Sequence, residues 1–129
     1  MQLTDHKPRT GTMRITKRFR FDAAHWLPMV PETHKCRRLH GHTYEVELAL
    51  EGNLDRKMGW VEDYGAVSAA FKPLLNELDH NCLNELSGLK NPTAENLAVW
   101  VFERLAPALP TLTEVTVRET ASTSAVYRP

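Results

Sequence analysis

The chain has 129 residues, of which 42% are hydrophobic, and its 16 basic and 16 acidic residues give a formal net charge of zero. This length predicts one domain with a single core, and the balanced charge argues against nucleic acid or a membrane surface as a partner. Two cysteines are too few for a disulfide scaffold and favour a reducing cytoplasm, and no apolar run approaches a membrane-spanning length.

The N-terminal part of the chain divides into a tail and a first strand. Residues 1–12 are polar and aperiodic, which predicts a flexible N-terminal extension, and residues 13–129 are expected to form the single domain. Alternate residues then make a mostly apolar row that ends in a histidine: Ile15, Lys17, Phe19, Phe21, Ala23 and His25. This period of two indicates a half-buried strand.

The most informative segment is residues 34–42, which contain three histidines and a cysteine. A second strand is predicted from His40 onward, because an inward row alternates with a polar, acidic row. Joined antiparallel to the first strand through residues 26–39, it would bring His25 beside His40 and His42 on one face of the sheet. The inward row is His40, His42, Tyr44, Val46, Leu48 and Leu50.

Three histidines on one sheet face predict a catalytic zinc site, since imidazoles are the usual ligands when a coordination position stays open for water or substrate. Cys36, four residues before His40, is a candidate nucleophile or base. In one alternative, Cys36 is the fourth ligand and closes a structural zinc site. In another, each histidine is an ordinary polar residue at the end of a strand.

Two amphipathic helices are expected after the hairpin, followed by two further strands. Apolar residues three and four positions apart over 64–78 predict the first helix, with Asp63 as N-cap and a kink or break at Pro73. Thr93 is expected to cap the second helix, with Glu95 in its first turn. The buried stripe of this second helix would be Leu97, Trp100, Val101 and Leu105.

Two polar features near the C-terminal half are candidates for function. Glu119 continues the apolar row of Val115 and Val117, where an uncompensated carboxylate is costly. It is either a strand-end or salt-bridged glutamate, or an anchor for a ligand edge with two N–H donors. Asp79 and His80 are neighbours between the helices, and such a pair, although common in loops, can orient an imidazole for proton transfer.

Several segments resemble, in order, the 6-pyruvoyl-tetrahydropterin synthase family over about residues 13–129. Cys36-x-x-x-His40-Gly41-His42 resembles the signature of the 6-carboxytetrahydropterin synthase branch, because pyruvoyl-forming relatives usually have a longer spacer after the cysteine. The other matching segments are 21–25, 59–64, 78–84, 91–96 and 117–120. Cys82 and His34 match no role in the family and are interpreted as a packing residue and a loop residue.

The resemblance implies an α+β T-fold, in which two helices pack on one face of a four-stranded antiparallel sheet. Such subunits assemble into barrels, commonly two stacked trimers forming a hexamer with active sites between subunits. It also implies Zn²⁺ as cofactor and assigns the functional residues. His25, His40 and His42 would bind the metal, Cys36, Asp79, His80 and Glu119 would be catalytic, and Glu119, Thr93 and Glu95 would bind substrate.

The implied reaction converts 7,8-dihydroneopterin triphosphate to 6-carboxy-5,6,7,8-tetrahydropterin, with release of acetaldehyde and triphosphate, in queuosine biosynthesis. Cys36 would remove a proton from the substrate side chain, His80 would return protons, and Glu119 would anchor the pterin. Three alternatives are a pyruvoyl-forming synthase, an aldolase acting on dihydroneopterin and a non-catalytic zinc-stabilised module. The short cysteine spacer disfavours the first, and the three histidines disfavour the second, which needs no metal.

Overall fold

The computed structural model of the chain describes residues 11–129, so the predicted extension lies almost entirely outside the described residues. The elements follow the order β-β-α-α-β-β, as predicted. The strands are β1 (Met13–His25), β2 (His40–Gly52), β3 (Leu112–Arg118) and β4 (Ala125–Tyr127), and the helices are α1 (Tyr64–Leu78) and α2 (Ala94–Leu105). Two short 3-10 helices, η2 (Lys35–Arg37) and η3 (Leu83–Glu85), were not predicted.

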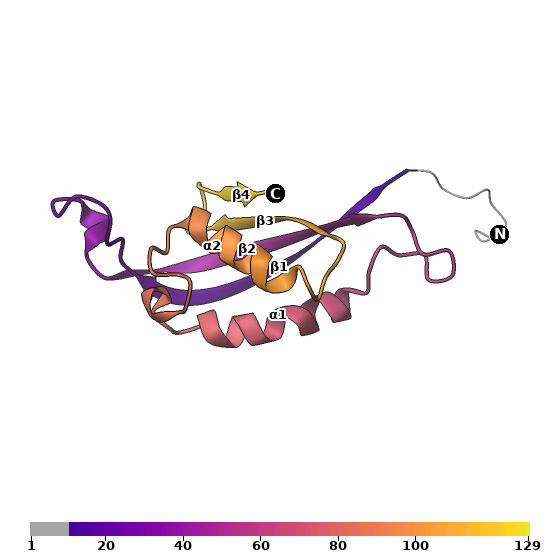
Figure 1. Cartoon of the computed structure of the whole chain (residues 1–129), viewed down its shortest axis with the longest axis horizontal. Helices are drawn as coiled ribbons and strands as arrows, with labels where there is room; N and C mark the ends of the chain where they lie inside the picture. Colours follow the sequence, from indigo (N-terminus) through magenta and orange to yellow (C-terminus); the bar gives the residue numbers. More distant parts are fainter. Residues whose placement is uncertain (1–10) are drawn as a thin grey trace.

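The four strands form one antiparallel sheet in the order β1-β2-β3-β4. The long β1–β2 hairpin extends along the longest axis of the molecule (Figure 1). The segment that connects its two strands projects beyond the helices and the other strands. Its register pairs His25 with His40 and Ala23 with His42. The predicted hairpin is therefore confirmed, including the proximity of the three histidines.

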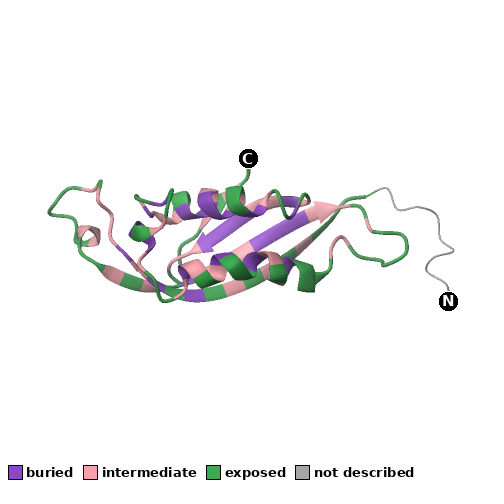
Figure 2. Cartoon of the chain, turned by 60° about the horizontal axis from the view of Figure 1, so that its bottom comes forward, coloured by how far each residue is buried: buried purple, intermediate pink, exposed green. Residues whose placement is uncertain are grey.

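Both helices cover the same face of the sheet and bury their apolar sides against it (Figure 2). α1 packs over β1, and α2 packs over β3 and β4. The inward row of β2 is buried from Tyr44 to Leu50 and forms the centre of the core. The helix residues buried against it are Val67, Phe71, Leu74, Leu78, Leu97, Ala98, Trp100, Val101 and Leu105.

The predicted helix caps are confirmed, but two details of α1 are not. Asp63 accepts a hydrogen bond from the Gly65 N–H, and Thr93 accepts one from the Asn96 N–H. The helix continues through Pro73 without the expected break. Pro73 lies on the exposed side, where water can replace the single lost hydrogen bond. Tyr64, the first apolar residue in the spacing that predicts this helix, is 52% exposed rather than part of the core.

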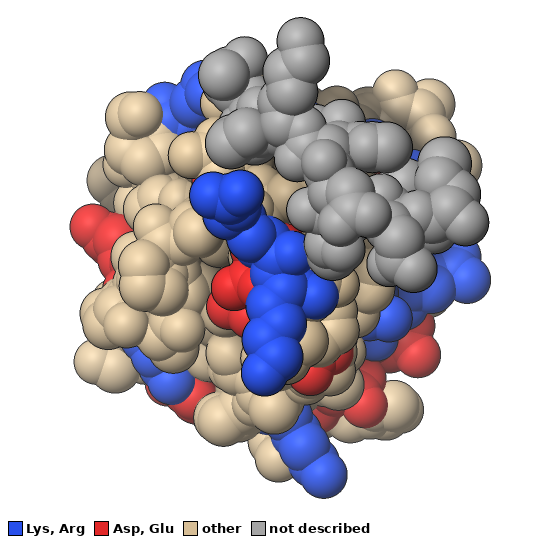
Figure 3. Space-filling model, turned by 90° about the vertical axis from the view of Figure 1, so that its right-hand side faces the viewer, with Lys and Arg blue, Asp and Glu red and all other residues tan. Residues whose placement is uncertain are grey.

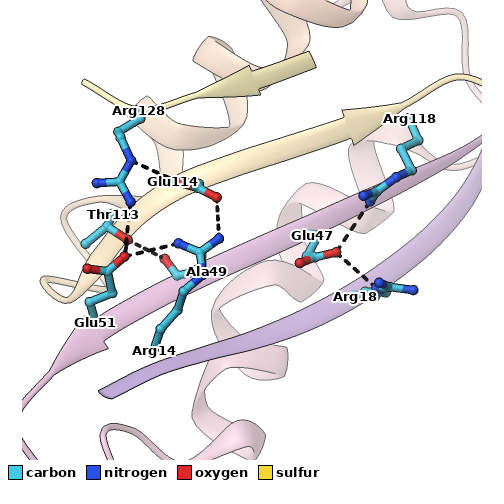
Figure 4. Close-up of polar contacts among 9 residues, drawn as sticks. All are labelled: Arg14, Arg18, Glu47, Ala49, Glu51, Thr113, Glu114, Arg118 and Arg128. Carbon is cyan, nitrogen blue, oxygen red and sulfur yellow. Dashed lines mark hydrogen bonds and ion pairs between the residues drawn. The ribbon is translucent and has the colours of Figure 1, made fainter. Parts of the chain in front are cut away.

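The face of the sheet away from the helices carries rows of opposite charge on neighbouring strands (Figure 4). Glu47 contacts Arg18 of β1 and Arg118 of β3, and the carboxylates of Glu51 and Glu114 pair with Arg14 and Arg128. Exposed pairs of this kind each stabilise little, but together they contribute attraction between neighbouring strands on this face.

Acidic and basic side chains are also interspersed at the end of the molecule shown in Figure 3. Among the described residues visible on this face, neither sign forms a broad patch. Among the described residues, no helix is both long enough and apolar enough to cross a membrane.

The core predicts a clear difference between two aromatic residues of α1. Phe71 is fully buried and stacks on Phe19 with ring centroids 4.2 Å apart, whereas Tyr64 is mostly exposed. Phe71→Ala should lower the free energy of unfolding by about 3–5 kcal/mol, through lost burial and the cavity left behind. Tyr64→Ala is the control and should change it by about 0.5 kcal/mol or less. Urea denaturation measures both, and equal losses would contradict this description of the core.

Candidate active site

Three histidines converge where β1 ends and β2 begins. One ring nitrogen from each of His25, His40 and His42 lies within 4.8 Å of the other two. The Nε2 atoms of His25 and His40 are 3.0 Å apart, and the ring centroids of the three pairs are 4.6, 5.0 and 5.0 Å apart. His25 is buried, and the other two are partly exposed, so the cluster is accessible from one side.

Backbone carbonyls determine which nitrogen two of these rings present. The Nδ1 atom of His25 lies 2.8 Å from the Pro92 carbonyl oxygen, and the Nδ1 atom of His40 lies 2.7 Å from the Arg38 carbonyl oxygen. Since a carbonyl oxygen only accepts, each Nδ1 carries the hydrogen and each neutral ring offers the lone pair of Nε2. Two lone pairs facing each other repel unless a cation lies between them, so the donor set fits a metal ion.

Burial favours the neutral, metal-binding form of the histidines. Desolvation is the main cause that lowers the pKa of His25, against the opposing effects of the Pro92 hydrogen bond and Glu119. Desolvation also lowers the pKa of His42. Imidazoles must be neutral to coordinate a metal, so these shifts prepare the cluster for binding near neutral pH.

Gly41 and Tyr44 shape the strand beneath the histidines. A Cβ atom at Gly41 would lie 3.2 Å from the Ala23 carbonyl oxygen, so glycine is needed for close approach of the strands. Tyr44 packs edge-on against His25 and His42. Burial raises the pKa of its phenol, which has no hydrogen-bond partner among the described residues.

Cys36 lies near the cluster in sequence but is not part of it. It is half-buried in η2 and is a free thiol. The described residues that group as possible metal ligands around His25 do not include Cys36, which disfavours the closed structural site. His34 accepts a hydrogen bond from the Cys36 N–H and so caps η2, as expected of a loop residue.

Asp79 and His80 form a separate, exposed group together with Asp22. The Nδ1 atom of His80 lies 3.0 Å from Asp79 Oδ1. The pKa of the Asp79 carboxyl is lowered first by the Asp22 N–H and then by His80, which supports an ionised carboxylate orienting the imidazole. His80 has a φ of 60°, a left-handed conformation that is rare for a residue with a side chain and is often retained at functional sites.

Asp79 and His80, the Asp79–His80 dyad, lie beside the outward-facing Asp22 of β1. Asp22 and Thr43 are a register pair in the outward rows of the two strands, and the Thr43 hydroxyl donates to Asp22. His80 lines a hollow of about 560 Å³ together with these two residues and His42. Among the described residues, therefore, His80 does not group with the three histidines as a ligand of one metal ion, although His42 and His80 line the same hollow.

Glu119 lies one residue beyond the end of β3, and its carboxylate is 3.8 Å from His25 Nε2. Because burial keeps His25 neutral, this contact is not an ion pair. No lysine or arginine forms an ion pair with Glu119 in the described part of the chain, so the salt-bridge alternative receives no support. Glu119 lines a cleft of about 680 Å³ together with His42 and Arg118, where a ligand could reach it.

The remaining predicted substrate residues lie at the start of α2. The Thr93 hydroxyl caps the helix, and Glu95 is an exposed residue of the first turn. Neither belongs to the histidine cluster, and their assignment as substrate-binding residues stays a prediction. Sequence reasoning missed the carbonyls of Arg38 and Pro92, because any residue type can supply a carbonyl at either position.

A sheet of this order, with two helices on one face and three inward histidines at its end, agrees with the T-fold. The solved structure of 6-pyruvoyl tetrahydropterin synthase from Caenorhabditis elegans is similar, with a TM-score of 0.86 and 26% identity, covering 94% of this chain and 98% of that chain. A family profile described as 6-pyruvoyl tetrahydropterin synthase matches residues 14–129. The chain therefore belongs to the 6-pyruvoyl tetrahydropterin synthase family, and the expected T-fold is confirmed.

Two curated relatives carry more specific names. The chain is 40% identical over 119 residues to a 6-carboxy-5,6,7,8-tetrahydropterin synthase from Synechocystis, covering 88% of this chain and 91% of the relative. It is 38% identical over 97 residues to a dihydroneopterin monophosphate aldolase from Pyrococcus furiosus, covering 75% of this chain and 78% of the relative. These two relatives are thus named for different reactions.

The geometry of the cluster predicts which histidines retain metal. The purified protein should contain about one zinc ion per chain, and His25→Ala, His40→Ala or His42→Ala should lose it, because each removes one of only three nitrogen ligands. His34→Ala is the control and should keep zinc, since its ring caps η2. Elemental analysis by mass spectrometry measures the content. Zinc loss from His34→Ala would show that the third ligand is wrongly assigned.

Proposed function

We propose that the protein is a zinc-dependent lyase that converts 7,8-dihydroneopterin triphosphate and one water molecule to 6-carboxy-5,6,7,8-tetrahydropterin, acetaldehyde and triphosphate, as a step of queuosine biosynthesis. The observation that carries the proposal is the three-histidine cluster, in which the Nε2 atoms of His25 and His40 face each other and the Glu119 carboxylate lies 3.8 Å from His25 Nε2. The identity to the Synechocystis synthase and the three-residue spacer between Cys36 and His40 support the carboxy product over the pyruvoyl product.

The proposed chemistry assigns separate tasks to the protein's residues. Zinc held by His25, His40 and His42 would supply Lewis acidity at the oxygens of the substrate side chain. Cys36 removes a proton from that side chain, and His80, held by ionised Asp79, returns protons to it. Glu119 accepts hydrogen bonds from the pterin edge, and the negative charge of its carboxylate strengthens such bonds. Thr93 and Glu95 are the further proposed contacts for substrate.

The position of the dyad supports an active site shared between subunits. Asp79 and His80 group with Asp22 rather than with the three histidines of their own chain. We therefore propose that His80 acts on substrate bound at the histidines of a neighbouring copy, in a hexamer of two trimers. The free thiols of Cys36 and Cys82 agree with a cytoplasmic location.

Product identification tests the proposal directly. The zinc-loaded protein is incubated with 7,8-dihydroneopterin triphosphate, and the products are separated and weighed by mass spectrometry. The proposal requires 6-carboxy-5,6,7,8-tetrahydropterin and acetaldehyde in equal amounts. A pyruvoyl-tetrahydropterin without acetaldehyde would identify the alternative synthase, and no turnover by zinc-loaded protein would favour the non-catalytic module.

A second candidate is aldolase activity on dihydroneopterin monophosphate, which the Pyrococcus furiosus relative favours. A retro-aldol cleavage would break a carbon–carbon bond of the same side chain but leave a 6-hydroxymethyl group and release glycolaldehyde phosphate. The same assay with dihydroneopterin monophosphate distinguishes the two. Cleavage of the monophosphate with no reaction of the triphosphate would replace the first proposal with this one.

Cys36→Ala tests the role of the thiol. The variant should keep its zinc and its fold but lose about 10²- to 10⁴-fold in turnover, the usual effect of removing a general base. Steady-state kinetics and zinc content are measured on the same sample. The control is Cys82→Ala, which should retain near-normal turnover. A variant of Cys36 that purifies without zinc would instead identify the thiol as a ligand.

Glu119→Gln separates binding from chemistry. The variant keeps the shape of the side chain but loses the charge and points an N–H donor at a pterin N–H. A charge-assisted hydrogen bond contributes about 1.5–3 kcal/mol, so the affinity for pterin should fall by roughly ten- to a hundredfold. Titration of a non-reactive pterin followed by calorimetry measures it. An unchanged affinity with a collapsed turnover would make Glu119 a proton relay rather than an anchor.

A further inference from the structure

Asn84 is a buried asparagine whose amide group binds the backbone of one other residue at two points. Its Nδ2 donates to the Trp26 carbonyl at 2.8 Å, and its Oδ1 accepts from the Trp26 N–H at 3.0 Å. Asn84 is only 5% exposed, and Trp26 directly follows the end of β1. The side chain thus pairs with Trp26 in the way that a neighbouring strand would.

This contact ends a row of bonds along the outer edge of β1. The Asp22 carbonyl accepts from the His80 N–H at 2.6 Å, and the Ala24 N–H donates to the Asn81 carbonyl at 3.0 Å. Ala24 also forms a parallel bridge with Cys82. Residues 79–84 therefore fix the end of β1 from the side opposite β2, and Asn84 carries this fixation past the strand into the connection that follows.

The same connection holds Cys36. The Leu27 N–H, one residue after Trp26, donates to the Cys36 carbonyl at 2.8 Å. The Arg37 guanidinium donates to the Val30 carbonyl at 2.9 Å, which draws the two sides of the connection together. Asn84 is thus hydrogen-bonded to Trp26, and the next residue, Leu27, is hydrogen-bonded to the backbone of Cys36.

We infer that Asn84 is a positioning residue that holds residues 26–39, and with them the Cys36 thiol, in a fixed place relative to the three histidines. The N–H and C=O groups of this buried amide are both hydrogen-bonded. Breaking these bonds would leave buried polar groups without a partner, so local opening of the segment is costly. The consequence for catalysis rests on the proposed function, in which Cys36 transfers a proton. Displacement of a reacting group by about 1 Å can cost about a hundredfold in rate.

The test compares Asn84→Leu with the wild-type protein. Leucine has a similar volume but forms neither bond, so amide hydrogen exchange in residues 26–39 should rise by about tenfold or more. Alkylation of Cys36 by iodoacetamide, followed by peptide mass mapping, should accelerate by about threefold or more. With the proposed substrate, kcat should fall by about ten- to a hundredfold, while KM and zinc content stay near wild type.

Leu105→Ala controls for general destabilisation, because it removes a buried side chain at the C-terminal end of α2. Leu105→Ala should raise amide hydrogen exchange throughout the chain, with no selective increase in residues 26–39. If Asn84→Leu does not fold, Asn84→Asp, which keeps the acceptor for the Trp26 N–H, is compared in the same way.

Unchanged exchange and alkylation would overturn the inference. So would a loss of turnover caused by loss of zinc, because Asn84 would then act on the ligands rather than on Cys36. If wild-type protein turns over no pterin triphosphate, the proposed function fails, whereas exchange and alkylation still decide the role of Asn84.

Discussion

The register between β1 and β2 is the constraint on which the sheet and the site both depend. It pairs His25 with His40 and is fixed from two sides. On the inner side Phe21 stacks on Tyr44, with ring centroids 5.1 Å apart, and on the outer side arginines of β1 face glutamates of β2. Because a slip of one residue would turn every side chain of a strand to the other face, it would expose the core row and separate the histidines.

Backbone atoms from distant segments complete what the register begins. The carbonyl of Pro92, just before α2, orients His25, and the carbonyl of Arg38, just before β2, orients His40. The entry into α2 and the end of the β1–β2 connection are thereby coupled to the two rings that face each other. The proposed metal would draw this arrangement together, since its ligands come from both strands and their orientation from two further segments.

The sequence predicted the strands and helices in which hydrophobic residues recur at a regular spacing. A period of two identified β1, β2 and the inward histidines, and a spacing of three and four identified both helices, because these patterns reflect the burial of one face. The break that was one expectation at Pro73 does not occur, because the cost of a proline depends on whether the exposed backbone can bind water. The role of Asn84 could not be read from sequence, because its partner Trp26 lies 58 positions away and offers only its backbone.

X-ray absorption at the zinc edge of the metal-loaded protein tests the central claim most directly, because it counts the atoms around the metal. An open site held by His25, His40 and His42 requires three imidazole nitrogens and an oxygen at about 2.0–2.1 Å, with no sulfur. The same spectrum should be unchanged in Cys36→Ala. A sulfur atom at about 2.3 Å that disappears in this variant would contradict the account, because Cys36 would then close the site and be unavailable for proton transfer.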